Sequence, residues 1–86
     1  MSYTVYLTET FQKVFVKKHK DKKQWLIDTI QELEQNPQAG KPLRGKLHGT
    51  WQLRIGPFRV WYEINETEKK VILKAVLHKD EATKFY

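Results

Sequence analysis

Apolar and polar residues alternate with a period of two on both sides of the Gly56-Pro57 step. This period is typical of strands that bury one face of a sheet. The pattern predicts strands at about residues 50–55 and 58–64, joined as an antiparallel hairpin by a turn at Gly56-Pro57. The same register places Arg54 directly across from Arg59. The expected apolar pairs of the hairpin are Ile55 with Phe58, Leu53 with Val60, and Trp51 with Tyr62.

Two cations at directly opposed positions need an explanation, because like charges there destabilise a sheet by roughly 0.2–1 kcal/mol. An anion bound between two guanidinium groups removes this cost, and phosphate oxygens suit their paired donors. We therefore interpret Arg54 and Arg59 as a candidate phosphate site. The alternative is that both are ordinary solvated residues of an exposed strand face.

The N-terminal part of the chain predicts one strand and two helices. Residues 3–7 alternate and are rich in strand formers, and Thr8 then offers an N-cap for a helix that ends near residue 19 or 20. Asp21 and Gln24 resemble a capping box for a second helix, which Asn36-Pro37 stops. The apolar stripes of the two helices, which we expect in the core, comprise Phe11, Val14, Phe15, Leu26, Ile30 and Leu33.

A last strand is expected at about residues 70–77, after a hairpin loop at residues 65–69, whereas residues 38–49 read as a loop rich in Gly, Pro and Lys. The elements run in the order βααβββ within a single domain, residues 1–86. The predicted fold class is α+β: a small antiparallel sheet of about four strands, covered on one face by the two N-terminal helices.

We expect the last strand to keep the apolar parity, through the pairs Ile64 with Val71, Tyr62 with Leu73, Val60 with Ala75 and Phe58 with Leu77. The opposite face then carries cations, an aromatic ring and a histidine: Gln52, Arg54, Arg59, Trp61, Glu63, Ile72, Lys74, Val76 and His78. Such a face suits single-stranded nucleic acid, because guanidinium groups bind phosphate and an indole stacks on a base. For Trp61 the alternative is packing against the stem of Lys74, its expected cross-strand neighbour.

Charge and composition limit the classes of partner and of enzyme that this chain can represent. The 86 residues carry a net charge of +6, which favours nucleic acid, the ribosome or an acidic protein as partner. The chain has no cysteine and no apolar run near the ~20 residues of a membrane span, so we expect a cytoplasmic protein without membrane contact. Its three histidines are not grouped with carboxylates, and Ser2 is the only serine, which argues against a metal hydrolase and a Ser-His-Asp hydrolase.

The element order, the segment Leu43-Arg44-Gly45, the hairpin of residues 51–62 and the ending Val76-Leu77-His78-Lys79 together resemble the RelE/ParE superfamily of toxins from toxin–antitoxin modules. The resemblance covers nearly the whole chain. For the RelE branch it implies a ribosome-dependent endoribonuclease that cuts translated mRNA and is neutralised by a cognate acidic antitoxin. Neither a metal nor a small-molecule cofactor is implied.

The resemblance also implies roles for individual residues. In Gly56-Pro57-Phe58-Arg59, the arginine matches the family residue that contacts the scissile phosphate, and Arg54 matches a basic position on the preceding strand. The implied catalytic set is completed by the terminal His78-Lys79 pair and by Tyr86 as a hydrogen-bond donor or stacking ring. The residues expected to contact RNA are Arg44, Lys46, His48, Gln52, Trp61 and Lys74.

Two positions depart from the RelE pattern. Gln52 stands where some members carry a second basic residue, and Thr83 stands near the place of a tyrosine. These departures keep two alternatives open: a DNA gyrase inhibitor of the ParE branch, and a nucleic-acid-binding module with weak or no catalysis.

Overall fold

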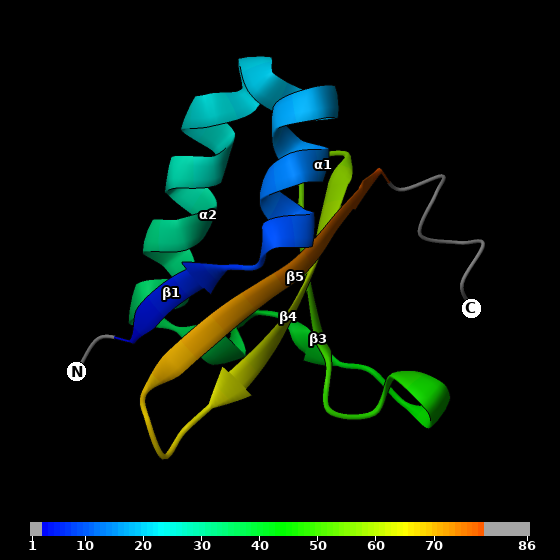
Figure 1. Ribbon diagram of the computed structural model, residues 1–86. Coiled ribbons are helices and arrows are strands. Elements are labelled where there is room, and N and C mark those ends of the chain that lie inside the picture. Colours follow the sequence, from blue (N-terminus) through cyan, green and yellow to red (C-terminus); the bar gives the residue numbers. More distant parts are fainter. Residues whose placement is uncertain (1–2, 79–86) are drawn as a thin grey trace.

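The computed structural model describes residues 3–78, in which one five-stranded sheet carries two helices on the same face (Figure 1). The strands are β1 (Thr4–Leu7), β2 (Lys41–Pro42), β3 (Trp51–Ile55), β4 (Phe58–Asn65) and β5 (Lys70–His78). The helices are α1 (Glu9–His19) and α2 (Lys23–Gln35), with 3-10 helices η1 (Lys20–Lys22), η2 (Pro37–Ala39) and η3 (Gly45–Leu47).

The predicted α+β class and the two covering helices are confirmed, but the sheet differs in two details. Its strand order is β1-β5-β4-β3-β2, so the short strand β2 adds a fifth member inside a segment that was expected to be a loop. In addition, β1 pairs with β5 in parallel, while the other pairs are antiparallel. The parallel pair arises because both helices lie between β1 and the rest of the sheet in sequence, which allows a crossover connection.

The start of α1 agrees with the sequence prediction, whereas the start of α2 differs from it. The Thr8 hydroxyl accepts a hydrogen bond from the Phe11 backbone N–H at 3.1 Å, which confirms the predicted N-cap of α1. The predicted capping box of Asp21 and Gln24 is wrong, because α2 begins at Lys23 after η1 and has no side-chain cap. The Gln24 amide instead donates to the Asp28 carboxylate at 3.0 Å, one helical turn further on.

The core lies between the helices and the sheet, and aromatic rings form its upper part. The Phe11 and Phe15 rings stack with centroids 6.2 Å apart, and Trp25 continues the series from Phe15 to Phe58. The buried apolar residues are Phe11, Phe15, Leu33, Leu53, Phe58, Val60, Tyr62, Val71, Leu73 and Val76. Val14, Leu26 and Ile30, which were also expected in the core, are partly buried and pack against it.

A bulge in the β4–β5 pair changes the predicted register of the last strand. The pairs Ile64 with Val71 and Tyr62 with Leu73 are confirmed, but the register shifts between Tyr62 and Trp61, which leaves Lys74 as an extra residue on β5. The two remaining predicted pairs are therefore wrong: Val60 pairs with Val76, and Phe58 pairs with His78. The shift turns Val76 into the core, where it is 3% exposed, and away from the polar face expected for it.

Candidate anion-binding site on the sheet

The β3–β4 hairpin has the predicted register, and Arg54 pairs directly with Arg59 across it. Both side chains lie on the sheet face opposite the helices, here called the far face, which also carries Gln52, Trp61 and Glu63. At the β2 side of this face, a pocket of about 340 Å³ brings the two arginines together with Lys41. Its lining residues are Ala39, Gly40, Lys41, Gln52, Leu53, Arg54 and Arg59.

Arg59 is the least satisfied cation of this pocket. Its Nε atom is buried, and none of residues 3–78 provides a hydrogen-bond acceptor for it. A buried donor without a partner costs about 1–3 kcal/mol, in addition to the repulsion from the opposed Arg54. An anion in the pocket would accept from Nε and offset the charges of both guanidinium groups and of the Lys41 ammonium.

Tyr62, a core residue, holds in place the part of the pocket that residues 39–41 form. Its hydroxyl donates to the Pro37 carbonyl at 2.7 Å and accepts from the Gly40 backbone N–H at 3.1 Å. Burial raises the pKa of the Tyr62 hydroxyl, and the hydrogen bond from Gly40 opposes this rise, so the group is neutral and able to donate at pH 7. These bonds hold η2 against the sheet and place Lys41 opposite Gln52 in the β2–β3 pair.

Gln52 and Trp61 form a joined pair next to the arginines. They are cross-strand partners, and the Trp61 indole N–H donates to the Gln52 side-chain oxygen at 2.9 Å. Each lies two residues from an arginine on its own strand, which corresponds to a separation of about 7 Å on the same face. This spacing matches the reach from a phosphate to a base of the same nucleotide chain.

Lys74 is placed differently from its predicted position. Trp61 pairs with Ala75 and not with Lys74, because Lys74 is the extra residue of the bulge. The Lys74 ammonium instead forms an ion pair with the Glu63 carboxylate at 2.7 Å, with both side chains about half exposed.

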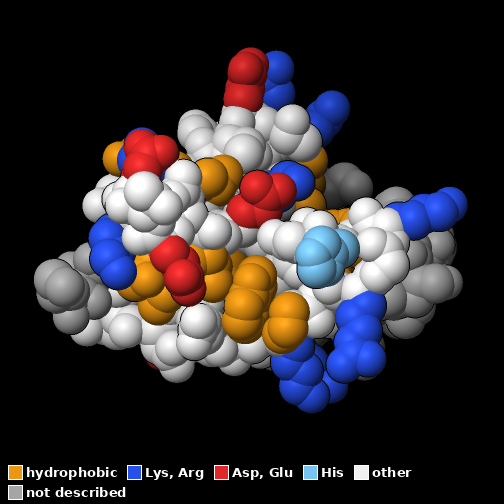
Figure 2. All heavy atoms as spheres, turned by 90° about the horizontal axis from the view of Figure 1, so that it is seen from below, with side chains coloured by type: hydrophobic (Ala, Val, Ile, Leu, Met, Phe, Trp, Pro, Cys, Tyr) orange, Lys and Arg blue, Asp and Glu red, His pale blue; other side chains and the backbone are white. Residues whose placement is uncertain are grey.

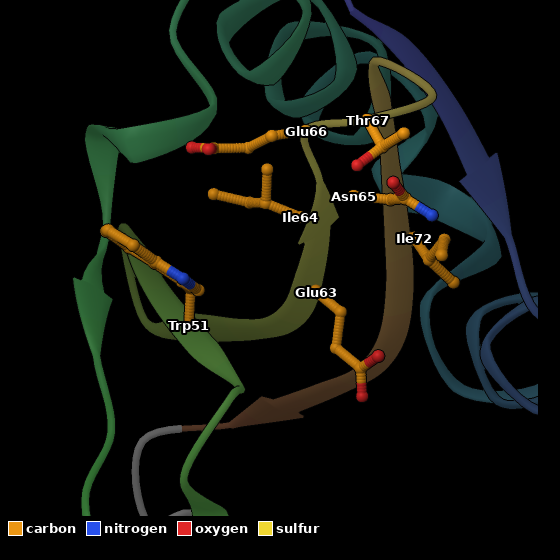
Figure 3. A pocket seen from close by; sticks show the side chains of 7 residues that line it. All are labelled: Trp51, Glu63, Ile64, Asn65, Glu66, Thr67 and Ile72. Carbon is orange, nitrogen blue, oxygen red and sulfur yellow. The ribbon is translucent and has the colours of Figure 1, made fainter.

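A second pocket, of about 490 Å³, lies by the turn between β4 and β5 (Figure 3). Figure 3 shows Ile64 and Glu66 extending toward the side of the Trp51 ring, and Glu63 also contributes to the lining. Two carboxylates at its rim repel a phosphate, so we assign the anion to the arginine pocket and not to this larger one.

The loop around η3 supplies further cations. Arg44, Lys46 and His48, which were predicted to contact RNA, are exposed there and do not line the arginine pocket. Seen from below, the charged side chains along the right and lower edge of the molecule are Lys and Arg, whereas both kinds of charge lie at the left and top (Figure 2). The loop therefore extends the positive surface beyond the pocket.

Of the predicted C-terminal catalytic residues, His78 is the last residue of β5. The backbone of His78 ends β5 opposite Phe58, so Leu77 and not His78 is the strand partner of Arg59. Lys79, Thr83 and Tyr86 lie outside the described residues. Sequence reasoning missed Lys41, because a two-residue strand is too short to show a period of two.

The Trp61 indole is expected to contribute to RNA affinity. Stacking of one base on an aromatic side chain is worth about 1–3 kcal/mol, so Trp61→Ala should weaken binding of a short single-stranded RNA roughly 5- to 150-fold. Fluorescence anisotropy measures the affinity, and Trp61→Phe, which keeps an aromatic face, should retain most of it. Unchanged affinity of a folded Trp61→Ala protein would remove the stacking role.

Comparison with known proteins agrees with this fold. The family model of the ParE toxin of type II toxin–antitoxin systems matches residues 5–83. A chain of the RelBE2 toxin–antitoxin complex from Mycobacterium tuberculosis is 30% identical, with a TM-score of 0.84 over 91% of this chain and 99% of that chain. No match is found among curated protein sequences.

Two more distant structures share the fold. A mutant of E. coli RelE in the free state has a TM-score of 0.72 at 21% identity, covering 99% of this chain and 98% of that one. The archaeal RelE–RelB complex from Pyrococcus horikoshii gives a TM-score of 0.72 at 20% identity, covering 92% and 97%.

The fold and the family match define the class of the protein as a toxin of a type II toxin–antitoxin system. The chain belongs to the ParE toxin family, within the group of RelE/ParE toxins that its sequence motifs resemble. Within residues 3–78, neither helix has the length and apolar character that crossing a membrane requires.

Proposed function

We propose that this toxin is a ribosome-dependent endoribonuclease that cuts translated mRNA. The observation that carries the proposal is the arginine pocket, in which the buried Nε of Arg59 has no acceptor among residues 3–78, while Arg54 and Lys41 add two further positive charges. A phosphodiester supplies the missing acceptor oxygens. The Gln52–Trp61 pair lies at the right spacing to contact the neighbouring base.

The reaction needs no metal ion. The RNA 2′-hydroxyl attacks the adjacent phosphorus, a P–O bond forms to that oxygen, and the bond to the 5′-oxygen of the next nucleotide breaks. Negative charge develops on the nonbridging oxygens, where Arg54 and Arg59 donate hydrogen bonds and stay protonated throughout. By the family resemblance, His78 and Lys79 exchange the protons of the 2′-hydroxyl and of the leaving oxygen, and Tyr86 assists by hydrogen bonding or stacking.

The proposal includes two macromolecular partners and a cytoplasmic location. The Mycobacterium tuberculosis relative is known as part of a toxin–antitoxin complex, and a net charge of +6 favours an acidic antitoxin for this chain. The same charge, together with the exposed Arg44, Lys46 and His48, supports docking on ribosomal RNA.

Inhibition of DNA gyrase is the second candidate, and the match to the ParE family model favours it. A gyrase inhibitor has no use for cations that stabilise a pentacoordinate phosphate. The arginine pocket therefore weighs toward the nuclease.

One experiment separates the candidates. Primer extension on a reporter transcript, with and without translation, is run beside a supercoiling assay with purified gyrase and the purified chain. Cuts inside codons that depend on translation are the expected result. Inhibited supercoiling with intact message would move the chain to the gyrase function, and the absence of both effects would favour a nucleic-acid-binding role.

A further inference from the structure

The far face of the sheet continues beyond the arginine pocket and Trp61 to the edge strand β1, which lies beside β5 (Figure 1). Val5 and Leu7 of β1 pack against the core. Tyr6, which lies between them, therefore points to the far face, where its large side chain is 47% exposed. Tyr6 and Trp61 are thus two aromatic residues on one face of the sheet, separated by the width of β5.

The two aromatic residues lie farther apart than neighbouring bases of a stacked strand. Tyr6 is level with Ile72 of β5 and with Glu63 of β4, and Glu63 is two residues from Trp61 along β4. Two strand spacings of ~4.8 Å and two residue steps of ~3.4 Å place the two Cα atoms roughly 12 Å apart. Stacked bases of one strand are ~3.4 Å apart, so a strand must extend to place a base on each ring.

Cations accompany the two rings across the far face. The Lys70 ammonium lies 5.3 Å from the centre of the Tyr6 ring, and Lys74 projects from β5, the strand between β1 and β4. Among the described strands, Glu63 is the only acidic residue, and the Lys74 ammonium pairs with its carboxylate at 2.7 Å. The negative charge of this face is therefore offset, and a phosphate chain that crosses the face meets no net repulsion there.

We propose that Tyr6 and Lys70 form a second RNA-binding subsite, in which a base stacks on the Tyr6 ring and the Lys70 ammonium contacts a phosphate beside it. The inference rests on the endoribonuclease function proposed above and extends its substrate to a single-stranded segment that crosses the sheet from the arginine pocket to β1. Sheet faces that carry aromatic side chains bind single-stranded RNA by stacking bases. Alternating rings and cations match a chain in which bases and phosphates alternate, whereas an acidic peptide has no base to stack.

Two lengths of RNA test the subsite, each with 2′-methoxy groups that prevent cleavage. A dinucleotide has one phosphate for the arginine pocket and one base for Trp61, whereas a decanucleotide is long enough to reach Tyr6. Tyr6→Ala should weaken binding of the decanucleotide about 5- to 150-fold and change binding of the dinucleotide less than about twofold. Tyr6→Phe keeps the ring and should bind both RNAs like the parent. Nuclear magnetic resonance titration measures the dinucleotide, and fluorescence anisotropy measures the decanucleotide.

Lys70→Gln and Lys69→Gln are a matched pair of charge changes at neighbouring positions. The Lys69 ammonium lies 5.2 Å from the centre of the Tyr3 ring, and Tyr3 packs against the core, so this cation lies away from the far face. Lys70→Gln should reduce the salt dependence of decanucleotide binding, the slope of log affinity against log salt concentration, by about 0.7, whereas Lys69→Gln should leave it unchanged. Glu68→Gln releases Lys70 from an ion pair of 3.0 Å and should strengthen decanucleotide binding about 2- to 5-fold.

The results separate the subsite from the proposed function. Equal effects of Tyr6→Ala on the two RNAs, or none on either, in a variant that melts like the parent would overturn the subsite, as would equal salt slopes for the two lysine variants. If Tyr6→Ala does not fold, the salt slopes decide. Arg59→Ala should weaken binding of both RNAs, and this result keeps the arginine pocket in place whether or not the subsite exists. If Arg59→Ala binds both RNAs like the parent, the phosphate site is wrong and the inference is overturned with it.

Discussion

Arg59→Ala is expected to abolish growth arrest and to lower mRNA cleavage on translating ribosomes by about 10²–10³-fold. In the proposed reaction, the guanidinium supplies a buried donor and a positive charge where the phosphate oxygens develop negative charge. The fold should persist, because the side chain lies on the far face and not in the core. Removal of the unsatisfied Nε and of the repulsion from Arg54 should leave the free energy of unfolding unchanged or slightly higher.

Two further variants control this experiment. Arg59→Lys keeps the charge but loses the paired donors, so its cleavage rate should fall between those of the parent and of Arg59→Ala. Lys13→Ala removes an exposed cation that is paired with Glu9 on helix α1, away from the arginine pocket, and it should keep nearly full activity. Growth arrest by Arg59→Ala at the parent level, with equal expression and an equal melting temperature, would contradict the site.

The hairpin of the site was predictable because several signals in the sequence agreed. A turn step, a period of two and apolar parity on both strands specify one register, and a slip by one residue would move every apolar side chain to the wrong face. The opposition of Arg54 and Arg59 follows directly from that register. The helix pair was predictable for the same reason, since its apolar stripes repeat at helical spacing.

The rest of the site depends on tertiary contacts that leave little trace in the sequence. The bulge at Lys74 is not signalled by glycine or by a change of apolar pattern, because Ala75 and Val76 both tolerate either face. Likewise, β2 forms because the Tyr62 hydroxyl holds Pro37 and Gly40, which come just before β2, against the sheet. Tyr62 and Gly40 are 22 residues apart in the sequence. The position of Lys41 in the pocket therefore depends on the hydrogen bonds of Tyr62, a core residue, and the sequence around Lys41 does not predict it.

Gly40→Ala is expected to lower both the free energy of unfolding of the toxin and its rate of RNA cleavage. A Cβ atom at residue 40 would clash with the Gln52 carbonyl oxygen and would lie 2.8 Å from the Tyr62 hydroxyl. The first contact is with backbone, so β2 must move away from β3, and the hydrogen bonds of Tyr62 to Pro37 and Gly40 are strained or lost. Overpacking and one lost buried hydrogen bond together cost about 2–4 kcal/mol, which corresponds to a fall in melting temperature of roughly 8–32 °C.

Comparison with Tyr62→Phe separates the two causes. That variant keeps the ring in the core and removes only the hydroxyl, so it should lose about 1–3 kcal/mol through the unpaired Pro37 carbonyl and Gly40 N–H. Both variants release the segment that carries Lys41, and RNA cleavage measured below their melting temperatures should fall in both, with the larger loss in Gly40→Ala. If Gly40→Ala melts within about 2 °C of the parent, a shift worth less than 1 kcal/mol, then the close approach of β2 to Gln52 does not position the pocket. If it unfolds early but cleaves normally at low temperature, then Lys41 is not part of the phosphate site, and Arg54 and Arg59 hold the anion alone.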